Sequence, residues 1–301
     1  MSQVVATEVE IQGAAIRLAG VLQVPAGSGS RPGLVLTGPF TGVKEQVVGH
    51  YAAALAAAGF VTLALDHRNF GASDGTVRQH EDSAGKLEDL RHATSYLTAH
   101  DRVDDGRLGC VGICLGGGYA LRHAAFDPWI RALAIVAGAF NDPRAMQRGM
   151  GVETYRQAMI GFAQHDQQQF ATGQVEYVAA VSDDPDTEAV MSGAEPFAYY
   201  GTARSASPGR VNQVTRLSIR ELLTFDAAMA GEFLGATPTL IVHGRRDAFC
   251  SPADAQALYD GLTGPRELRW LDTANQIDLY DQPAFVDPAV EHVARWMTDH
   301  L

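Results

Sequence analysis

Hydrophobic residues recur along this chain with two different spacings. Short apolar runs bounded by Gly, Pro or Asp are typical of buried strands, whereas apolar residues three or four positions apart indicate amphipathic helices. The predicted strands are 7–11, 15–24, 33–37, 60–66, 107–111, 132–136, 237–243 and 267–271, and the predicted helices are 44–58, 84–100, 119–126, 252–262 and 288–300. The first two strands meet at Gln12 and Gly13 and are predicted to form a hairpin. Strands that alternate with helices imply parallel pairing with right-handed crossovers, and therefore an α/β fold.

The alternation stops at Asn141 and resumes after residue 235. In between, the sequence is amphipathic and helical in pattern, without clear strands. A helical insertion between two halves of one sheet indicates a lid over the sheet. We therefore expect one interrupted domain, with residues 1–140 and 236–301 as the α/β core and residues 141–235 as a helical cap.

Composition narrows the classes of partner. The chain has 301 residues, 46% of them hydrophobic, and 23 basic against 35 acidic side chains give a net charge of −12. This negative charge, without a basic cluster, argues against nucleic acid and membrane surfaces as partners. No apolar run of about 18 residues predicts a membrane span, and residues 1–4 lack the pattern of a signal peptide. Three cysteines without a Cys-x-x-Cys pair favour reduced thiols in a cytoplasmic protein. We expect Cys110 to face the core and Cys250 to lie in a loop, and we assign neither a role.

The strand at 107–111 leads into Gly112-Ile113-Cys114-Leu115-Gly116-Gly117-Gly118, and a helix follows. A strand, a sharp turn and a helix, with glycines two residues before and after a nucleophile, are the signature of a nucleophile elbow. The turn strains the backbone at Cys114 and exposes its thiol at the carboxyl edge of the sheet. Glycine is expected at 112 and 116 because a Cβ there would collide with the neighbouring helix and strand. The chain has no Gly-x-Gly-x-x-Gly, Walker or His-Glu-x-x-His motif, so we expect neither an organic cofactor nor a metal.

Landmarks across almost the whole chain resemble those of the α/β-hydrolases, specifically a dienelactone-hydrolase-like bacterial group with a cysteine in the elbow. The matching segments are Gly42–Gln46, Gly112–Cys114, Tyr199–Thr202, His243–Asp247, Asp278–Asp281 and Val286–Pro288. The resemblance implies an α/β-hydrolase fold with a helical cap, in which Cys114 is the nucleophile and Asp247 the triad acid. It also implies an oxyanion hole made by the backbone N–H groups of Leu115 and of Phe40, with Thr41 as the alternative to Phe40.

This chain departs from the resemblance at the catalytic base. The group places a histidine two residues before its Asp-Leu-Tyr-Asp signature, and this chain has Gln276 there. The acidic residue that dienelactone hydrolases carry after the third strand is also missing from Gly38–Gly42. An imidazole takes the thiol proton and later returns one, whereas a glutamine amide carries no proton at usable pH, so ordinary hydrolysis should lose about 10²–10⁴-fold. We expect the Gln276 amide to hydrogen-bond Asp247 instead.

Four further residues are candidates for the site. His67 lies just past one predicted strand and His243 ends another, at the carboxyl edge where ligands bind in open α/β sheets, so either is a candidate relocated base or substrate contact. The alternative is that both are ordinary loop or partly buried histidines. Tyr199 and Tyr200 are candidate substrate contacts in the cap, and the alternative is that they form the core of the cap.

These observations predict an enzyme that acts on an ester, thioester, lactone or activated carbonyl of a hydrophobic small molecule. Because Gln276 replaces the histidine, we expect acyl transfer, cyclisation or isomerisation in specialised metabolism rather than hydrolysis. Two alternatives stay open: conventional cysteine hydrolysis with a relocated base, and a binding protein without catalysis. A glutamine introduced by mutagenesis is a further alternative, although Asn275 beside it also departs from the pattern and favours natural divergence. The sequence leaves the oligomeric state open, with a homodimer as one option.

Overall fold

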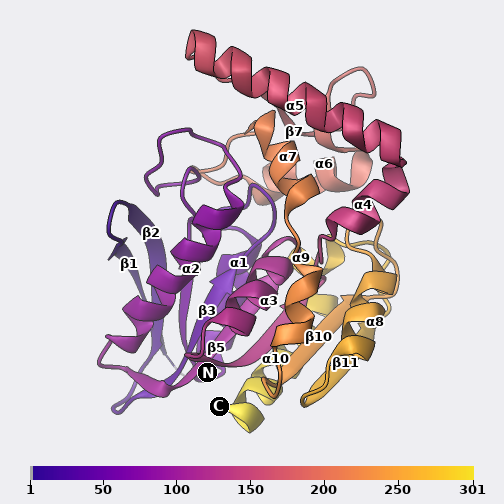
Figure 1. Ribbon diagram of the computed structural model, residues 1–301. Helices are drawn as coiled ribbons and strands as arrows, with labels where there is room; N and C mark the ends of the chain where they lie inside the picture. The colour runs from indigo at the N-terminus through magenta and orange to yellow at the C-terminus, as the bar shows by residue number, and fades with distance from the viewer. Residues whose placement is uncertain (1–2) are drawn as a thin grey trace.

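A central sheet organises the protein, for which a computed structural model describes residues 3–301. The sheet has eight strands in the order β1-β2-β4-β3-β5-β6-β10-β11 (Figure 1). These strands are β1 (Val4–Gln12), β2 (Arg17–Pro25), β3 (Arg31–Thr37), β4 (Val61–Leu65), β5 (Val103–Ile113), β6 (Ile130–Val136), β10 (Thr239–Gly244) and β11 (Arg266–Leu271). Strand β2 runs antiparallel to β1 and to β4, and all other neighbours are parallel. The mostly parallel sheet confirms the predicted α/β architecture.

Helices cover both faces of the sheet because successive strand residues point to opposite sides. The helices are α1 (Val47–Ala57), α2 (Ser83–Thr98), α3 (Gly116–Phe126), α8 (Pro252–Gly261), α9 (Asp278–Asp281) and α10 (Pro283–His300). In β3, Val35 packs in one buried cluster with residues of α2, α3 and α8. Its neighbours Leu34 and Leu36 pack in the other cluster, with residues of α1, α9 and α10. No helix within residues 3–301 is long and apolar enough to cross a bilayer.

The predicted elements of the core are all present, but several of their ends differ. Strands β1 and β2 pair from Val4 with Pro25 to Gln12 with Arg17, so the turn of the hairpin follows Gln12 and extends to residue 16. Helix α10 begins at Pro283 rather than at Pro288. Both prolines fit a helix start, because the first turn needs no N–H partner, and Pro288 is in fact accommodated inside the helix.

Residues 141–235, which we call the cap, follow β6 in the chain; residues 143–224 lie above the main sheet in Figure 1, whereas residues 228–233 pack against α3 and α8. The elements of the cap are α4 (Pro143–Met150), α5 (Val152–Thr172), β7 (Tyr177–Ser182), β8 (Ala189–Ser192), α6 (Ala194–Tyr200), the short 3₁₀ helix η1 (Ala203–Ser205), β9 (Val214–Thr215), α7 (Leu217–Thr224) and the 3₁₀ helix η2 (Ala228–Phe233). The prediction of a cap without strands is wrong, because β7 pairs with β8 and β9 in a second, three-stranded sheet. A short apolar run such as Tyr177–Ser182 fits a strand or part of a helix, so periodicity alone does not separate the two.

Candidate active site

Cys114 occupies the sharp turn between β5 and α3. Its φ of 56° is a conformation that residues other than glycine rarely adopt, as the predicted elbow requires. The turn is held by hydrogen bonds from Cys114 N–H to the carbonyl of Val136 (3.1 Å) and from Ala139 N–H to the carbonyl of Cys114 (2.9 Å). A Cβ at Gly112 would lie 2.4 Å from the carbonyl oxygen of Gly116, and a Cβ at Gly116 would lie 2.4 Å from that of Thr37. Both glycines are therefore required by the close approach of backbone to backbone.

A cavity of about 360 Å³ lies between this turn and the cap. The lining from the core is Phe40, Cys114, Leu115, Ala139, Phe249, Cys250, Gln276, Ile277 and Tyr280. The lining from the cap is Asn141, Met146, Val190, Met191, Glu195, Pro196, Tyr200, Ile219, Leu222 and Leu223. The volume is in the range of small-molecule sites, and mostly apolar walls with a few polar groups suit a hydrophobic ligand.

The Cys114 thiol is surrounded by hydrogen-bond donors. Cys250 donates its S–H to Cys114 across an Sγ–Sγ distance of 3.8 Å. This hydrogen bond is the largest cause of a lowered pKa at Cys114; the Tyr280 hydroxyl and the Leu115 N–H act in the same direction, while burial and the charge of Asp247 oppose them. The same contact, together with burial, raises the pKa of Cys250. Of the two thiols, Cys114 at the turn is therefore the one that ionises more readily.

Gln276 is buried and holds the donors that surround Cys114. Its Nε2 donates to Cys250 Sγ and to the Tyr280 hydroxyl, both at 3.0 Å. Each amide hydrogen is therefore used, which leaves the S–H of Cys250 and the O–H of Tyr280 free to point at Cys114. The backbone N–H of Gln276 donates to Glu195 Oε1 at 2.9 Å and so ties this residue to the cap. The glutamine is a positioned hydrogen-bond donor at the place where a histidine was expected.

Asp247 does not hydrogen-bond Gln276, and the predicted contact between them is wrong. Its Oδ1 instead accepts the backbone N–H groups of Phe249 (2.9 Å) and Cys250 (2.7 Å). Its Oδ2 is buried and has no partner within residues 3–301. Burial raises the pKa of Asp247 to about 6, against the effect of the two backbone donors. A carboxylate oxygen without a partner is what the removal of an imidazole N–H would leave behind.

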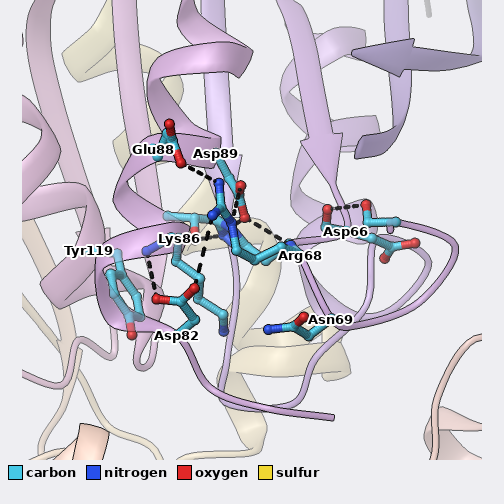
Figure 2. Close-up of polar contacts among 12 residues, drawn as sticks. Asp66, Arg68, Asn69, Asp82, Lys86, Glu88, Asp89 and Tyr119 are labelled. Atoms are coloured by element: carbon cyan, nitrogen blue, oxygen red, sulfur yellow. Dashed lines mark hydrogen bonds and ion pairs between the residues drawn. The ribbon is translucent and has the colours of Figure 1, made fainter. Parts of the chain in front are cut away.

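His67 and His243 both lie outside the cavity lining. His67 Nε2 is 2.9 Å from Thr37 Oγ1, and its Nδ1 is 3.3 Å from the carboxylate of Asp89. The ring belongs to a buried charged cluster in which Arg68 also pairs with Asp89 (Figure 2). His243 is fully buried, and its Nδ1 lies 2.9 Å from the carbonyl oxygen of Gly244. Burial lowers the pKa of both histidines, and neither ring is placed to take a proton from Cys114.

The backbone donors expected for the oxyanion hole divide into two groups. Leu115 and Phe40 both line the cavity; Leu115 follows Cys114 after β5, and Phe40 follows the neighbouring strand β3. Thr41 is not part of the lining; it is buried and adopts a φ of 57°, which turns the chain after Phe40. The geometry therefore favours Phe40 over Thr41 as the second donor.

Only one of the two cap tyrosines lines the cavity. Tyr200 lines the cavity, whereas Tyr199 is buried behind it. The Tyr199 ring packs edge-on against Tyr200 and Tyr280, with centroid distances of 4.8 and 5.0 Å. Tyr199 therefore supports the cavity wall, and Tyr200 is the candidate ligand contact.

Sequence reasoning missed three residues of this site, namely Cys250, Tyr280 and Glu195. A thiol three positions after Asp247 was a usable signal, because a turn folds back over that distance. Tyr280 lies four residues after Gln276, but the two are joined by a turn into α9 rather than by one helix. Glu195 comes from the cap, and nothing local in the sequence connects it to the core. Within residues 3–301, no group of three or more His, Cys, Asp or Glu side chains could hold a metal ion.

Comparison with known proteins places this site in a family. Residues 41–274 match the family model described as serine aminopeptidase, S33. The chain belongs to this family of α/β-hydrolases. The matched span includes Cys114 and Asp247, and it ends just before Gln276.

Relatives in this family cover most of the chain. The uncharacterized protein YcjY of Escherichia coli strain K12 is 31% identical over 280 residues, which are 89% of this chain and 88% of that protein. The acyltransferase drtE of Aspergillus calidoustus is 26% identical over 264 residues, 86% of this chain and 84% of its own. The thiohydrolase aneE of Aspergillus aculeatus is 23% identical over 279 residues, 91% of this chain and 87% of its own.

Solved structures agree with the fold. The crystal structure of the hypothetical protein PA2218 from Pseudomonas aeruginosa has a TM-score of 0.89 at 26% identity, covering 100% of this chain and 95% of that one. A dienelactone hydrolase from Anabaena variabilis has a TM-score of 0.59 at 16% identity, with 99% of each chain covered. The narrower resemblance to dienelactone hydrolases is therefore a likeness of fold.

Proposed function

We propose that this protein is an acyl-transfer enzyme, in which Cys114 takes an acyl group from an ester or thioester and passes it to an acceptor other than water. The observation that carries the proposal is the position of Cys114 Sγ, which accepts the S–H of Cys250, a contact that lowers its pKa, in an apolar cavity whose lining, among residues 3–301, includes no histidine. A thiolate attacks a carbonyl without a base, whereas water needs one. The site therefore supports the first half of the triad reaction and disfavours its hydrolytic second half.

In the first half, Cys114 Sγ bonds to the carbonyl carbon and the carbonyl electrons move onto oxygen. The N–H groups of Leu115 and Phe40 are the donors for this oxyanion, and each such donor contributes about 2.7–4 kcal/mol. The oxyanion then collapses, the leaving thiolate or alkoxide departs, and the acyl group stays on Cys114 as a thioester. Donors that lower the pKa of Cys114 also make it a weaker nucleophile, so activated donors such as thioesters suit it best.

In the second half, the acceptor attacks this thioester. Glu195 is the one carboxylate in the cavity lining within residues 3–301, so we assign it the acceptor's proton. Its Oε1 accepts the Gln276 N–H, which fixes the carboxylate at the cavity wall. A thiol, with a pKa of about 8.5, gives up its proton far more readily than water does, so the Glu195 carboxylate favours thiol acceptors over water. When the acceptor belongs to the same substrate, the reaction is a cyclisation.

The relatives support both halves of this proposal without deciding between acceptors. One is named an acyltransferase and another a thiohydrolase, so both names describe the movement of an acyl group. Hydrolysis is consequently the competing outcome that an experiment must separate from transfer.

The test is a measurement of product partition. The enzyme is incubated with a medium-chain acyl thioester and N-acetylcysteamine as the acceptor thiol, and the new thioester and the free acid are quantified by chromatography. We expect the new thioester to dominate, the reaction to be lost in Cys114→Ala, and Cys110→Ala to behave like the parent. Free acid as the main product in the presence of acceptor, or turnover that survives Cys114→Ala, would overturn the proposal.

A further inference from the structure

The geometry of the cavity points to a second chemistry at the same turn. We propose that Cys114 and Cys250 form a site of reversible oxidative modification, which a peroxide entering the cavity converts into an intramolecular disulfide. The inference rests on the position of two thiols, and it holds whether or not the protein transfers acyl groups.

The distance between the two sulfur atoms and their shared position in the cavity are the first support for this inference. The two sulfur atoms are 3.8 Å apart, and a disulfide of about 2.05 Å requires them to approach by less than about 2 Å. Both side chains line the same cavity, so a small oxidant that reaches one is beside the other. Cys250 lies in the loop between β10 and α8, where its side chain is not locked inside a helix or strand. The third cysteine, Cys110, is fully buried on β5 and is not part of the cavity lining.

The hydrogen bonds decide which sulfur reacts first. Cys114 accepts the S–H of Cys250 and is the more readily ionised of the two, so its thiolate form is the one that attacks a peroxide. Its electron pair forms an S–O bond, the O–O bond breaks, and hydroxide leaves and is protonated by solvent. Cys114 is thereby oxidised to the sulfenic acid, and the hydrogen peroxide is reduced to water.

Cys250 then resolves the sulfenic acid. Its sulfur attacks Cys114 Sγ, the S–O bond breaks, and the departing hydroxyl takes the thiol proton to leave as water. The balance is two thiols and one hydrogen peroxide in, one disulfide and two waters out. A dithiol reductant reverses the change by thiol–disulfide exchange.

The disulfide has two consequences for the site. It removes the nucleophilic sulfur of Cys114, and it removes the S–H donor that lowers the pKa of Cys114. Oxidation beyond the sulfenic acid is irreversible for most cysteines, and formation of the disulfide protects Cys114 from it. A cysteine at position 250 is thus a protective feature of the nucleophile and more than a hydrogen-bond donor.

The experiment counts free thiols on the intact chain. The reduced protein is treated with hydrogen peroxide, denatured, alkylated with iodoacetamide and weighed. The untreated chain should take three alkyl groups, and the treated chain should take one, with loss of two hydrogen atoms from the unalkylated mass. A non-reducing peptide map should join the Cys114 and Cys250 peptides, and dithiothreitol should restore three alkylations.

The peptide map of the parent shows by itself whether the Cys114–Cys250 disulfide forms. Two variants test the role of the other cysteines. Cys110→Ala should still form the disulfide, whereas Cys250→Ser should accumulate Cys114 with two or three added oxygen atoms. The inference is overturned if the parent itself accumulates those oxygen adducts on Cys114 while Cys250 stays alkylatable. It is also overturned if the disulfide involves Cys110 or joins two chains. Loss of acyl transfer in an otherwise oxidisable protein would count against the proposed function alone.

Discussion

Replacing Asp247 with asparagine tests whether burial of the Asp247 carboxylate destabilises the folded protein when that group is ionised. Burial raises its pKa to about 6 from an ordinary value of 3.8. A shift of about 2 units, at 1.36 kcal/mol per unit, corresponds to about 3 kcal/mol, which partial exposure reduces to about 2–3 kcal/mol. The native state holds this proton more tightly than the unfolded chain does, so ionisation destabilises the fold. The penalty is absent below the unfolded pKa, grows between the two pKa values and is complete above pH 6.

Asparagine cannot ionise, and its Oδ1 can still accept the N–H groups of Phe249 and Cys250. The free energy of unfolding of Asp247→Asn minus that of the parent should therefore rise by about 2–3 kcal/mol from pH 4 to pH 7. Urea unfolding followed by circular dichroism at several pH values measures this difference. Asp272→Asn is the matched control, because that side chain is 82% exposed and its difference should stay flat. A falling difference for Asp247→Asn would show that the carboxylate has a favourable partner, and a flat one that burial does not raise its pKa; both would contradict the structure.

Three other substitutions test separate parts of the site. Gln276→Leu removes the donor that orients Cys250 and Tyr280, so the pH profile of Cys114 alkylation should move up by about one unit, the value of one hydrogen bond. Gly116→Ala places a Cβ 2.4 Å from a backbone oxygen, so it should lower the free energy of unfolding measured by chemical denaturation by about 3 kcal/mol. Gly161→Ala is the control, because a Cβ at this position of helix α5 has no atom within 4 Å; this variant should be neutral or stabilising. Glu195→Gln should slow transfer from the acyl-enzyme to a thiol by about tenfold or more and leave acylation unchanged in single-turnover assays.

The core of the fold is predictable because its signals are local. Each buried strand is a short apolar run, and the glycines around Cys114 mark a turn that admits no Cβ on either side. The ends of elements were less certain because proline fits a helix start at more than one position, as Pro283 and Pro288 illustrate. The strands of the cap were missed because short apolar runs such as β7 carry no period that excludes a helix.

The chemistry of the site was predictable only as far as sequence order fixes it. The order of landmarks placed Cys114, Asp247 and Gln276 near one sheet edge, but their contacts depend on how loops from different strands turn their side chains. Asp247 points Oδ1 at its own loop, and Cys250 from that loop faces Cys114. His67 follows a strand at the same edge, yet its ring is held inside a charged cluster. Contacts between loops are tertiary facts, and no spacing along the chain encodes them.

The most direct test of the central claim is the lifetime of an acyl group on Cys114, followed by intact mass spectrometry after a pulse of acyl thioester without acceptor. The parent should carry one acyl group that persists, and Cys114→Ala should carry none. In Gln276→His, an imidazole borders the cavity and the unpartnered oxygen of Asp247 is available to orient it, so the adduct should clear by hydrolysis about 10²–10⁴-fold faster. Equal clearance in the parent and Gln276→His, or no adduct on Cys114 in either, would contradict a thiolate that accepts acyl groups and withholds them from water.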